Sequence, residues 1–326
     1  MTGIRLAMMA LAALMAVIVP STEGQAQANF PSRVVKLVVP YPPGGGTDLL
    51  ARVLAQQLGR KWGQSVIVEN ISGASGNVGA AEVARANPDG YTLLLASPGP
   101  IATNAFLYKD MSYDPAKWVP IALLATSPYM LDLSPGFTGS SLADVIAQAK
   151  AEPGRLTNAT AGVGSIGQLA TVELEMLARI HMLQVPYKGL APAMSDLLAG
   201  NVATLFDIVG TSLPLYRAGK IKIAAVASTE RIKELPDIPT LAEAGVPGFR
   251  AVTFFAVVAP PQTPDALADK INRDVVACLN DPEFIDKTKA LAMDLTPGSR
   301  AQAAKFFADE RALWGKVIKA AAIAMQ

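Results

Sequence analysis

The stretch VVPYPPGGGTDLLARVLAQQL, residues 38–58, decides the fold. A β-like run leads through three consecutive glycines into a segment where Leu50, Leu54 and Leu58 recur four residues apart. This spacing predicts a helix with one apolar face. A helix start that follows a glycine turn has free backbone N–H groups, and the helix dipole favours negative charge there. The stretch therefore predicts an anion-binding loop between a strand and a helix.

The glycines Gly44 to Gly46 do not belong to a nucleotide-binding signature. Thr47 or Asp48 suits the N-cap of the predicted helix. A dinucleotide fingerprint needs a third glycine where Leu49 stands, and the Gly-Lys-Ser/Thr of a Walker loop is missing. The segment is therefore either an anion site or a plain glycine turn before a helix.

Short β-branched runs alternate with helical patterns along most of the chain. The runs form two series, residues 34–41, 65–71 and 91–97, then 155–162, 181–187 and 202–209. Such alternation favours parallel sheets with helices on both faces. We therefore expect an α/β fold.

Two extended stretches, residues 118–134 and 249–260, separate these series and are long enough to pass between lobes. We expect a discontinuous first lobe, residues 29–124 and 253–326, and a second α/β lobe, residues 125–252. A ligand cleft between the two lobes is then the natural binding site.

The N-terminal residues predict a secretory signal peptide. Arg5 precedes an apolar run, residues 6–19, which is shorter than the roughly 20 residues of a membrane span. Ala26-Gln27-Ala28 has the small-x-small pattern of signal peptidase sites. We therefore expect cleavage after Ala28 and an exported, soluble protein.

Composition excludes several functional classes. The formal net charge of +1 argues against a nucleic-acid-binding surface. The lone Cys278 cannot form an internal disulfide, and with His181 as the single histidine a structural zinc site is not expected. No cofactor or metal is expected.

The second lobe offers a counterpart to the first glycine loop. AGVGSIGQLA, residues 161–170, again places glycines and a hydroxyl, Ser165, between a strand and a helix. Residues 72–77 and 97–104 follow two further strands of the first lobe, and ligands of open α/β sheets gather at such strand ends. Two helix starts that face each other across a cleft could clamp a small carboxylate.

Other residues at strand ends leave alternatives open. A carboxylate such as Asp207, at the end of an apolar strand, needs partners. It either receives a ligand ammonium or hydroxyl, or it bonds backbone N–H groups of a neighbouring loop. Tyr187 suits a cleft wall and Lys188 a solvated loop charge. Phe254 and Phe255 either line the cleft or pack in the core, and the core is favoured.

The sequence offers no competent catalytic set. A nucleophile elbow needs glycine two residues before Ser165, where Val163 stands. His181 begins an apparent strand away from the glycine loops, so a base for serine chemistry is missing. Asp48, Glu69, Asp132 and Asp207 have no spacing that demands acid/base chemistry.

Five longer segments occur in this order: PYPPGGGTDLLAR, VENISGASGNVGAAEVARANPDGYTLL, VPYKGLAPAMSDLLAGNV, AAVASTERIKELPDIPTLAEAGVPGF and APPQTP. Together they resemble the Bug family, the TctC-type periplasmic solute-binding receptors of tripartite tricarboxylate transporters. The likeness runs from about Phe30 to the C-terminus. It implies a type II periplasmic-binding-protein fold whose lobes close on a small organic acid, with its carboxylate held by backbone and hydroxyl groups.

The resemblance also implies the contact residues. In the first lobe they are Pro43, Gly44, Gly45, Gly46, Thr47, Asp48, Ser97 and Asn104; in the second they are Gly164, Ser165, Tyr187 and Asp207. Ile166 and Gln168 stand where the family often has proline and histidine, and Phe254 and Ala256 where tryptophan and glycine are common. These departures leave the identity of the ligand open.

The function that the sequence favours is a non-catalytic receptor. We expect a monomer that delivers a small carboxylate, an organic acid or an acidic amino acid, to the membrane subunits of a tripartite transporter. A ligand-binding partner of a sensor kinase ectodomain is the first alternative. A periplasmic enzyme acting on a carboxylated substrate is the second.

Overall fold

The computed structural model describes residues 30–162, 164–187, 189–289, 293–321 and 323 of the 326-residue chain. The predicted signal peptide and its cleavage site, like Lys188, lie outside the described residues. In the part of the chain that the structure describes, none of the helices is long and apolar enough to cross a membrane.

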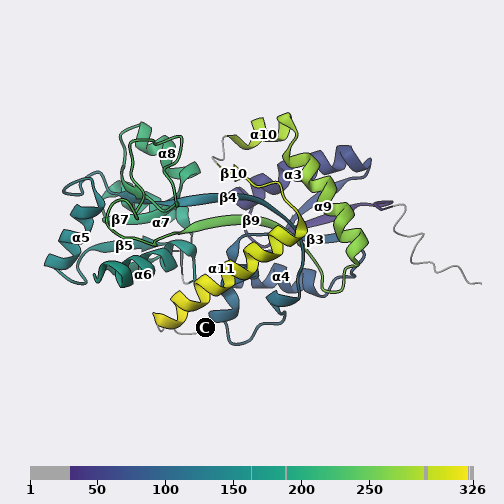
Figure 1. The fold of residues 1–326 in the computed structure, drawn as a ribbon, viewed down its shortest axis with the longest axis horizontal. Helices are drawn as coiled ribbons and strands as arrows, with labels where there is room; N and C mark the ends of the chain where they lie inside the picture. The colour runs from purple at the N-terminus through teal and green to yellow at the C-terminus, as the bar shows by residue number, and fades with distance from the viewer. Residues whose placement is uncertain (1–29, 163, 188, 290–292, 322, 324–326) are drawn as a thin grey trace, which may run out of the picture.

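The first lobe is a mixed sheet covered by helices on both faces (Figure 1). Strand β1 (Val35–Val39) lies between the parallel strands β2 (Val66–Asn70) and β3 (Thr92–Ala96). Its helices are α3 (Gly46–Trp62), α4 (Asn77–Ala84), α9 (Asp265–Leu279) and α10 (Pro282–Lys289), with short helical turns η1 (Ala74–Gly76), η2 (Gly99–Thr103), η3 (Asn104–Phe106) and η4 (Pro115–Lys117).

The second lobe repeats the βα pattern on a smaller scale. Its strands are β5 (Thr157–Thr160), β6 (Leu183–Pro186), β7 (Thr204–Ile208) and β8 (Lys222–Val226). Its helices are α5 (Leu142–Ala151), α6 (Ile166–Ala178), α7 (Leu190–Ala199) and α8 (Val209–Arg217). The α/β class and the two-lobed architecture expected from the sequence are confirmed.

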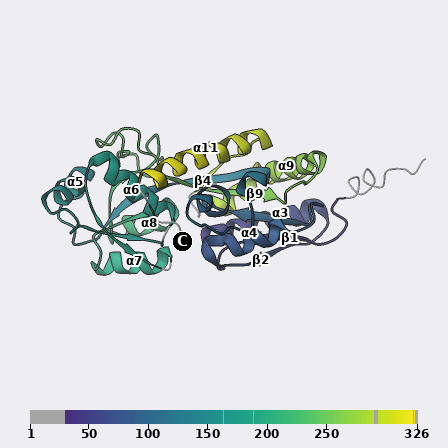
Figure 2. The ribbon, with the colours of Figure 1, turned by 90° about the horizontal axis from the view of Figure 1, so that it is seen from below.

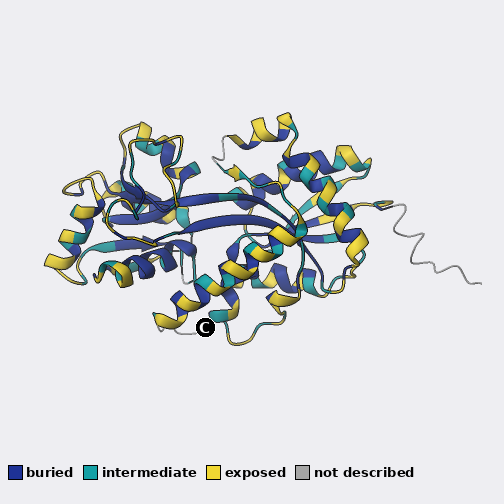
Figure 3. Ribbon diagram, viewed as in Figure 1, coloured by how far each residue is buried: buried dark blue, intermediate teal, exposed yellow. Residues whose placement is uncertain are grey.

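Two long strands connect the lobes. Strand β4 (Val119–Leu133) pairs with β9 (Val252–Ala259) and with the short β10 (Asp294–Leu295) in the first lobe. From Tyr129 onward β4 pairs with β7 and β8 of the second lobe. Both connecting strands are buried over most of their length (Figure 3). Phe254 and Phe255 are 0% and 3% exposed, which confirms that they belong to the core.

The directions of the strands bring the loops of the two lobes toward each other. Since β3 and β4 both pair antiparallel with β9, β3 runs with β4 toward the second lobe, and β1 and β2 run with β3. Strand β7 is antiparallel to β4 and parallel to β5, which is parallel to β6, so these strands end toward the first lobe. The loops after both sets of strands therefore face each other.

The C-terminal helix α11 (Arg300–Ala320) runs alongside both lobes (Figures 1 and 2). In the first lobe Phe307 stacks on Phe254 with ring centroids 5.8 Å apart. Further along the same helix, Trp314 and Ile318 are buried in the core of the second lobe, beside α6. The helix therefore belongs to the packing of both lobes.

Candidate functional site

The first glycine loop begins α3 without a side-chain cap. Gly45 is the N-cap of the helix, so the expectation that Thr47 or Asp48 caps it is wrong. Gly44 adopts φ +90°, a left-handed conformation that favours glycine. A Cβ on Gly46 would lie 3.2 Å from Met293 Cε, so the start of the helix is closely packed. The uncapped first turn has backbone N–H donors for an anion.

Asp48 turns inward and braces this loop. Its Oδ2 accepts hydrogen bonds from Gly44 N and from Arg52 Nε, both at 2.9 Å, and its Oδ1 accepts from Asn70 Nδ2 at 3.0 Å. Burial opposes ionisation, but the hydrogen bonds from Arg52, Gly44 and Asn70 outweigh it and hold the pKa of Asp48 below its usual value. The buried carboxylate therefore shapes the loop from within.

Two polar side chains tie the other first-lobe loops to this one. Ser97 Oγ donates to Tyr41 Oη at 2.8 Å, which joins the loop after β3 to the loop after β1. Burial raises the pKa of Tyr41 to about 12, although hydrogen bonds from Ser97 oppose the rise. Asn104 Nδ2 donates to Asn77 Oδ1 at 2.7 Å and to Ser75 O at 3.1 Å, in the segment after β2. Tyr41, which was not among the predicted contacts, is thus part of the loop network.

Three hydrogen bonds among the described residues hold the second glycine loop at the start of α6. Ser165 is the N-cap: its Oγ accepts from Gln168 N at 3.3 Å and donates to Gly162 O at 2.8 Å. Gln168 Oε1 in turn accepts from Gly164 N at 2.6 Å. Gln168, which stands where the family often has histidine, therefore closes the loop.

Tyr187 and Asp207 make their contacts within the second lobe. Tyr187 Oη donates to Asp196 Oδ2 of α7 at 2.5 Å. Asp207 is 1% exposed and accepts from Ile208 N at 2.7 Å and from Thr211 Oγ1 at 2.6 Å. Burial raises the pKa of Asp207 to about 6, opposed by these hydrogen bonds. Of the two roles open for Asp207, the structure contains backbone N–H bonding, from the next residue rather than from a neighbouring loop.

Contacts beside these loops connect the two lobes. Leu107, directly after η3 in the first lobe, is 1% exposed and packs with the core of the second lobe. It lies against the open face of Gly164. Tyr129, where β4 enters the second lobe, is buried, and burial followed by the charges of Asp207 and Tyr41 raises its pKa. Tyr129 was not among the predicted site residues, because it belongs to an apolar crossing segment and only strand pairing places it beside these loops.

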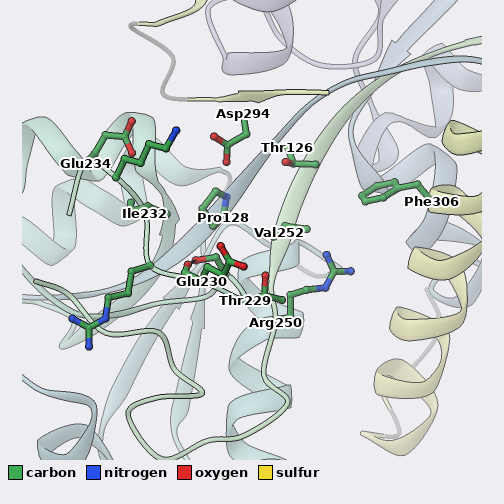
Figure 4. Close-up of a pocket in the computed structure, with 13 residues that line it drawn as sticks. Thr126, Pro128, Thr229, Glu230, Ile232, Glu234, Arg250, Val252, Asp294 and Phe306 are labelled. Carbon is green, nitrogen blue, oxygen red and sulfur yellow. Dashed lines mark hydrogen bonds between the residues drawn. The ribbon is translucent and has the colours of Figure 1, made fainter. Parts of the chain in front are cut away.

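A separate cavity of about 410 Å³ lies beside β4 and the start of β9, where the segment that follows β8 and Asp294 of β10 also line it (Figure 4). Residues of both lobes line it, among them Thr126, Glu234, Arg250, Asp294 and Phe306. None of the predicted contact residues lines it. The described residues contain no cluster of three or more His, Cys, Asp or Glu side chains that could hold a metal ion.

Comparison with known proteins assigns the family. The model of the tripartite tricarboxylate transporter family receptor matches residues 50–323. The chain belongs to this receptor family. Protein BugT of Bordetella pertussis is 34% identical over 293 residues, which are 89% of this chain and 90% of BugT. The resemblance drawn from the sequence motifs is thereby confirmed.

Solved structures of receptors of this kind have the same architecture. The chain is similar to R. palustris Rpa4515 with adipate, with a TM-score of 0.84, 38% identity and coverage of 91% of this chain and 100% of that one. It is also similar to MatC from Rhodopseudomonas palustris with bound malate, with a TM-score of 0.79, 31% identity and coverage of 89% and 100%.

Proposed function

We propose that this receptor captures a small carboxylate between its two glycine loops. The observation that carries the proposal is that the loops before α3 and α6, one from each lobe, lie at strand ends that face each other. Each loop is held by its own hydrogen bonds, through Asp48 in the first lobe and through Gln168 in the second. A preorganised loop loses little conformational freedom when the ligand binds.

In this proposal the backbone of the first loop holds one carboxylate group. The N–H groups of Gly45, Gly46 and Thr47 are the donors, and the dipole of α3 adds favourable charge. Backbone donors stabilise an anion without a buried counter-cation, so the ligand can leave when the lobes open. Asp48, Ser97 and Asn104 support the loops from behind rather than facing the ligand.

The second lobe then contacts the remainder of the ligand. Gly164 and Ser165 lie at the start of α6, and Tyr187 and Asp207 lie at the ends of the neighbouring strands. The dicarboxylates adipate and malate in the two similar structures support an organic acid as the ligand. We further propose export to the periplasm with cleavage after Ala28, action as a monomer without catalysis, and delivery to the membrane subunits of a tripartite transporter.

The test is a thermal-shift and calorimetric screen of the chain from Asn29 onward, after unfolding and refolding to remove any bound ligand. The panel contains mono-, di- and tricarboxylates and acidic amino acids. A ligand at 100 times its dissociation constant adds about 2.7 kcal/mol to the free energy of unfolding. Absence of any response in a correctly refolded preparation would overturn the proposal.

A pair of helix caps gives a matched control. Ser165 caps α6 and Ser141 caps α5, and each Oγ accepts from the backbone N–H three residues on. Replacing either serine by alanine costs about 1 kcal/mol of stability. Only Ser165→Ala should also weaken ligand binding. An equal loss of affinity in both variants would show that the effect comes from stability alone.

A further inference from the structure

A buried carboxyl group lies next to the proposed site but belongs to none of the predicted contacts. Asp132 of β4 is 0% exposed, and its Oδ2 is hydrogen-bonded to Ser212 Oγ of α8, itself 0% exposed. Its Oδ1 is buried without a hydrogen-bond partner among the described residues. The apolar side chains of Met130, Leu213 and Ile223 surround this position. A carboxyl group in such surroundings needs a structural or functional reason.

The strand register relates Asp132 to Asp207. Met130 lies opposite Asp207 in the pairing of β4 with β7, and Asp132 lies opposite Leu205. Residues two apart on a strand share a face, so Asp132 and Asp207 are diagonal neighbours on one face of the sheet. Helix α8, which begins two residues after Asp207, packs on this face through Val209 and Leu213. Ser212 is thus a buried residue of a helix whose first turn is bonded to Asp207.

The surrounding charges cannot neutralise two carboxylates. The titratable and charged side chains on the strands and the helix around Asp132 are Asp207, Tyr129, Tyr216, Arg217 and Lys222. The loop that packs on the same cluster through Leu235 adds Glu230, Arg231, Lys233, Glu234 and Asp237, but its two cations are engaged elsewhere: Arg231 pairs with Glu243, and Lys233 is exposed. Lys222 Nζ donates instead to Phe137 O at 2.7 Å and to Gly139 O at 3.0 Å, and Arg217 is exposed at the far end of α8. A buried carboxyl beside a second one and without a cation favours its neutral form.

The pKa shifts of Asp132 and Asp207 agree with this geometry. Burial, and then the charge of Asp207, raises the pKa of Asp132 well above its usual value, with Ser212 opposing. For Asp207 the rise caused by burial is opposed by hydrogen bonds from Thr211 and Ile208, and least by Ser212. The hydrogen bond that Ser212 Oγ makes in the structure is to Asp132, and its effect on the pKa of Asp207 indicates that it also lies near that carboxyl group.

We propose that Asp132 is a positioning residue for ligand capture: as a neutral carboxylic acid it donates its proton to Ser212 Oγ, and the Ser212 hydroxyl then donates to Asp207. The chain Asp132–Ser212–Asp207 fixes the end of β7 and the first turn of α8, at the edge that faces the first lobe. This inference rests on the proposed function, because Asp207 is one of the proposed ligand contacts. It leaves one negative charge on the pair rather than two.

The protonation is tested on the protein without ligand. In the infrared difference spectrum of wild type minus Asp132→Asn at neutral pH, we expect the carbonyl band of a protonated carboxylic acid. Asparagine is the matched replacement, because its amide N–H₂ can donate to Ser212 in place of the acid proton. Absence of a protonated-acid band in the difference spectrum would overturn the inference.

The positioning role is tested by hydrogen exchange and by affinity. In Asp132→Ala and Ser212→Ala, amides of the first turn of α8 should exchange faster, and affinity for the probes adipate and malate should fall at least about tenfold, equal to 1.4 kcal/mol. Asp132→Asn should match wild type in both readouts. If Asp132→Asn is as impaired as Asp132→Ala, the neutral-acid role is wrong.

The experiments distinguish failure of the proposed function from failure of the positioning role of Asp132. If neither probe nor any other acid of the panel binds wild type, the proposed function fails, while the infrared and exchange data still decide the role of Asp132 at α8. If acids bind wild type but α8 exchanges identically in all variants, the positioning inference alone fails.

Discussion

Leu107 of the first lobe occupies the space beside Gly164 of the second lobe that a side chain on Gly164 would fill. A Cβ built on Gly164 would overlap Leu107 Cδ1. Gly164 also adopts φ +77°, so both its backbone and its surroundings favour glycine. The contact joins the lobes next to Ser165, which makes the packing of Leu107 depend on how closely the lobes approach.

Gly164→Ala should therefore impair ligand binding beyond its effect on stability. Gly200, at the C-cap of α7, has the same φ of +77° but no atom within 4 Å of a built Cβ, so Gly200→Ala is the matched control. Each change costs about 1 kcal/mol of unfolding free energy for the left-handed backbone. Calorimetry should show at least about tenfold weaker binding for Gly164→Ala alone. Equal affinities in the two variants would mean that the Leu107 contact has no part in capture.

Replacing Asp48 should loosen the first glycine loop. Asp48→Asn removes charge from a buried group that receives donors from Gly44, Arg52 and Asn70, so we expect a loss of about 1–3 kcal/mol at pH 7. The pKa of Asp48 is lowered in the folded protein, so its contribution is present above the unfolded pKa and disappears as pH falls through the folded pKa. The difference in unfolding free energy between wild type and Asp48→Asn, measured by urea unfolding, should be smaller in acid than at pH 7.

The control for this loop is Asp144→Asn at the start of α5. Hydrogen bonds from Ser141 and Ser140 also lower the pKa of Asp144, but this carboxylate lies in a capping box outside the proposed site. Ligand affinity should fall for Asp48→Asn and stay unchanged for Asp144→Asn. Unchanged affinity in Asp48→Asn would show that the loop keeps its binding conformation without the carboxylate.

A buried glutamate between α6 and α11 should make stability fall as pH rises. Glu173 of α6 is 8% exposed, and burial raises its pKa to about 7, with Arg250 opposing and Glu310 adding to the rise. Arg250 is already ion-paired with Glu310, which also accepts from Trp314 Nε1 at 2.9 Å. The ionised form of Glu173 is therefore poorly compensated in the folded state.

The sign of this pH dependence follows from linkage. Because the folded pKa lies above the unfolded one, the contribution of Glu173 is complete below about pH 4.5 and is lost as pH rises through about 7. Between pH 5 and 8 wild type should lose about 2 kcal/mol more unfolding free energy than Glu173→Gln. Parallel pH profiles for the two proteins would show that Glu173 ionises without cost.

Local sequence patterns predicted the elements, and pairing between distant residues decided the details of the site. The leucine spacing of α3 and the glycine turns locate both loops because they depend on neighbouring residues alone. The inward turn of Asp48 depends on Asn70, which pairing of β1 with β2 brings beside it. Arg52, four residues after Asp48, was the one local signal of that network.

The roles of Tyr129 and Asp132 were not predicted for the same reason. Both lie in a mostly apolar crossing segment in which the spacing of Asp132 demands no chemistry, and only the register of β4 with β7 brings Asp132 beside Asp207. The capping prediction for Thr47 or Asp48 failed because propensity favours a polar N-cap, whereas the helix here begins at an uncapped glycine. An uncapped helix start is costly unless water or a ligand supplies the acceptor.

The cavity beside β4, which residues of both lobes line, predicts a way to weaken binding from outside the site (Figure 4). We expect rotation about β4 and β9 that closes the ligand loops to move the two sides of this cavity apart. There Asp294 of the first lobe faces the loop with Lys233 and Glu234 of the second. Burial, and then the charge of Glu234, raises the pKa of Asp294, with Lys233 opposing. Repulsion between Asp294 and Glu234 therefore favours a form in which the two sides of the cavity lie farther apart, which we expect to be the closed form.

Glu234→Lys replaces that repulsion with attraction and should hold the two sides of the cavity together, so affinity should fall by roughly two- to fivefold, the scale of an exposed ion pair. Glu234→Gln, which only removes the repulsion, should give a smaller loss. Both effects should fade at high salt, because exposed charges are screened over about 10 Å at 0.1 M. Calorimetry at low and high salt measures the affinities, and small-angle scattering of the ligand-free proteins reports the opening. Tighter binding by Glu234→Lys would mean that the two sides of the cavity do not move apart when the loops close.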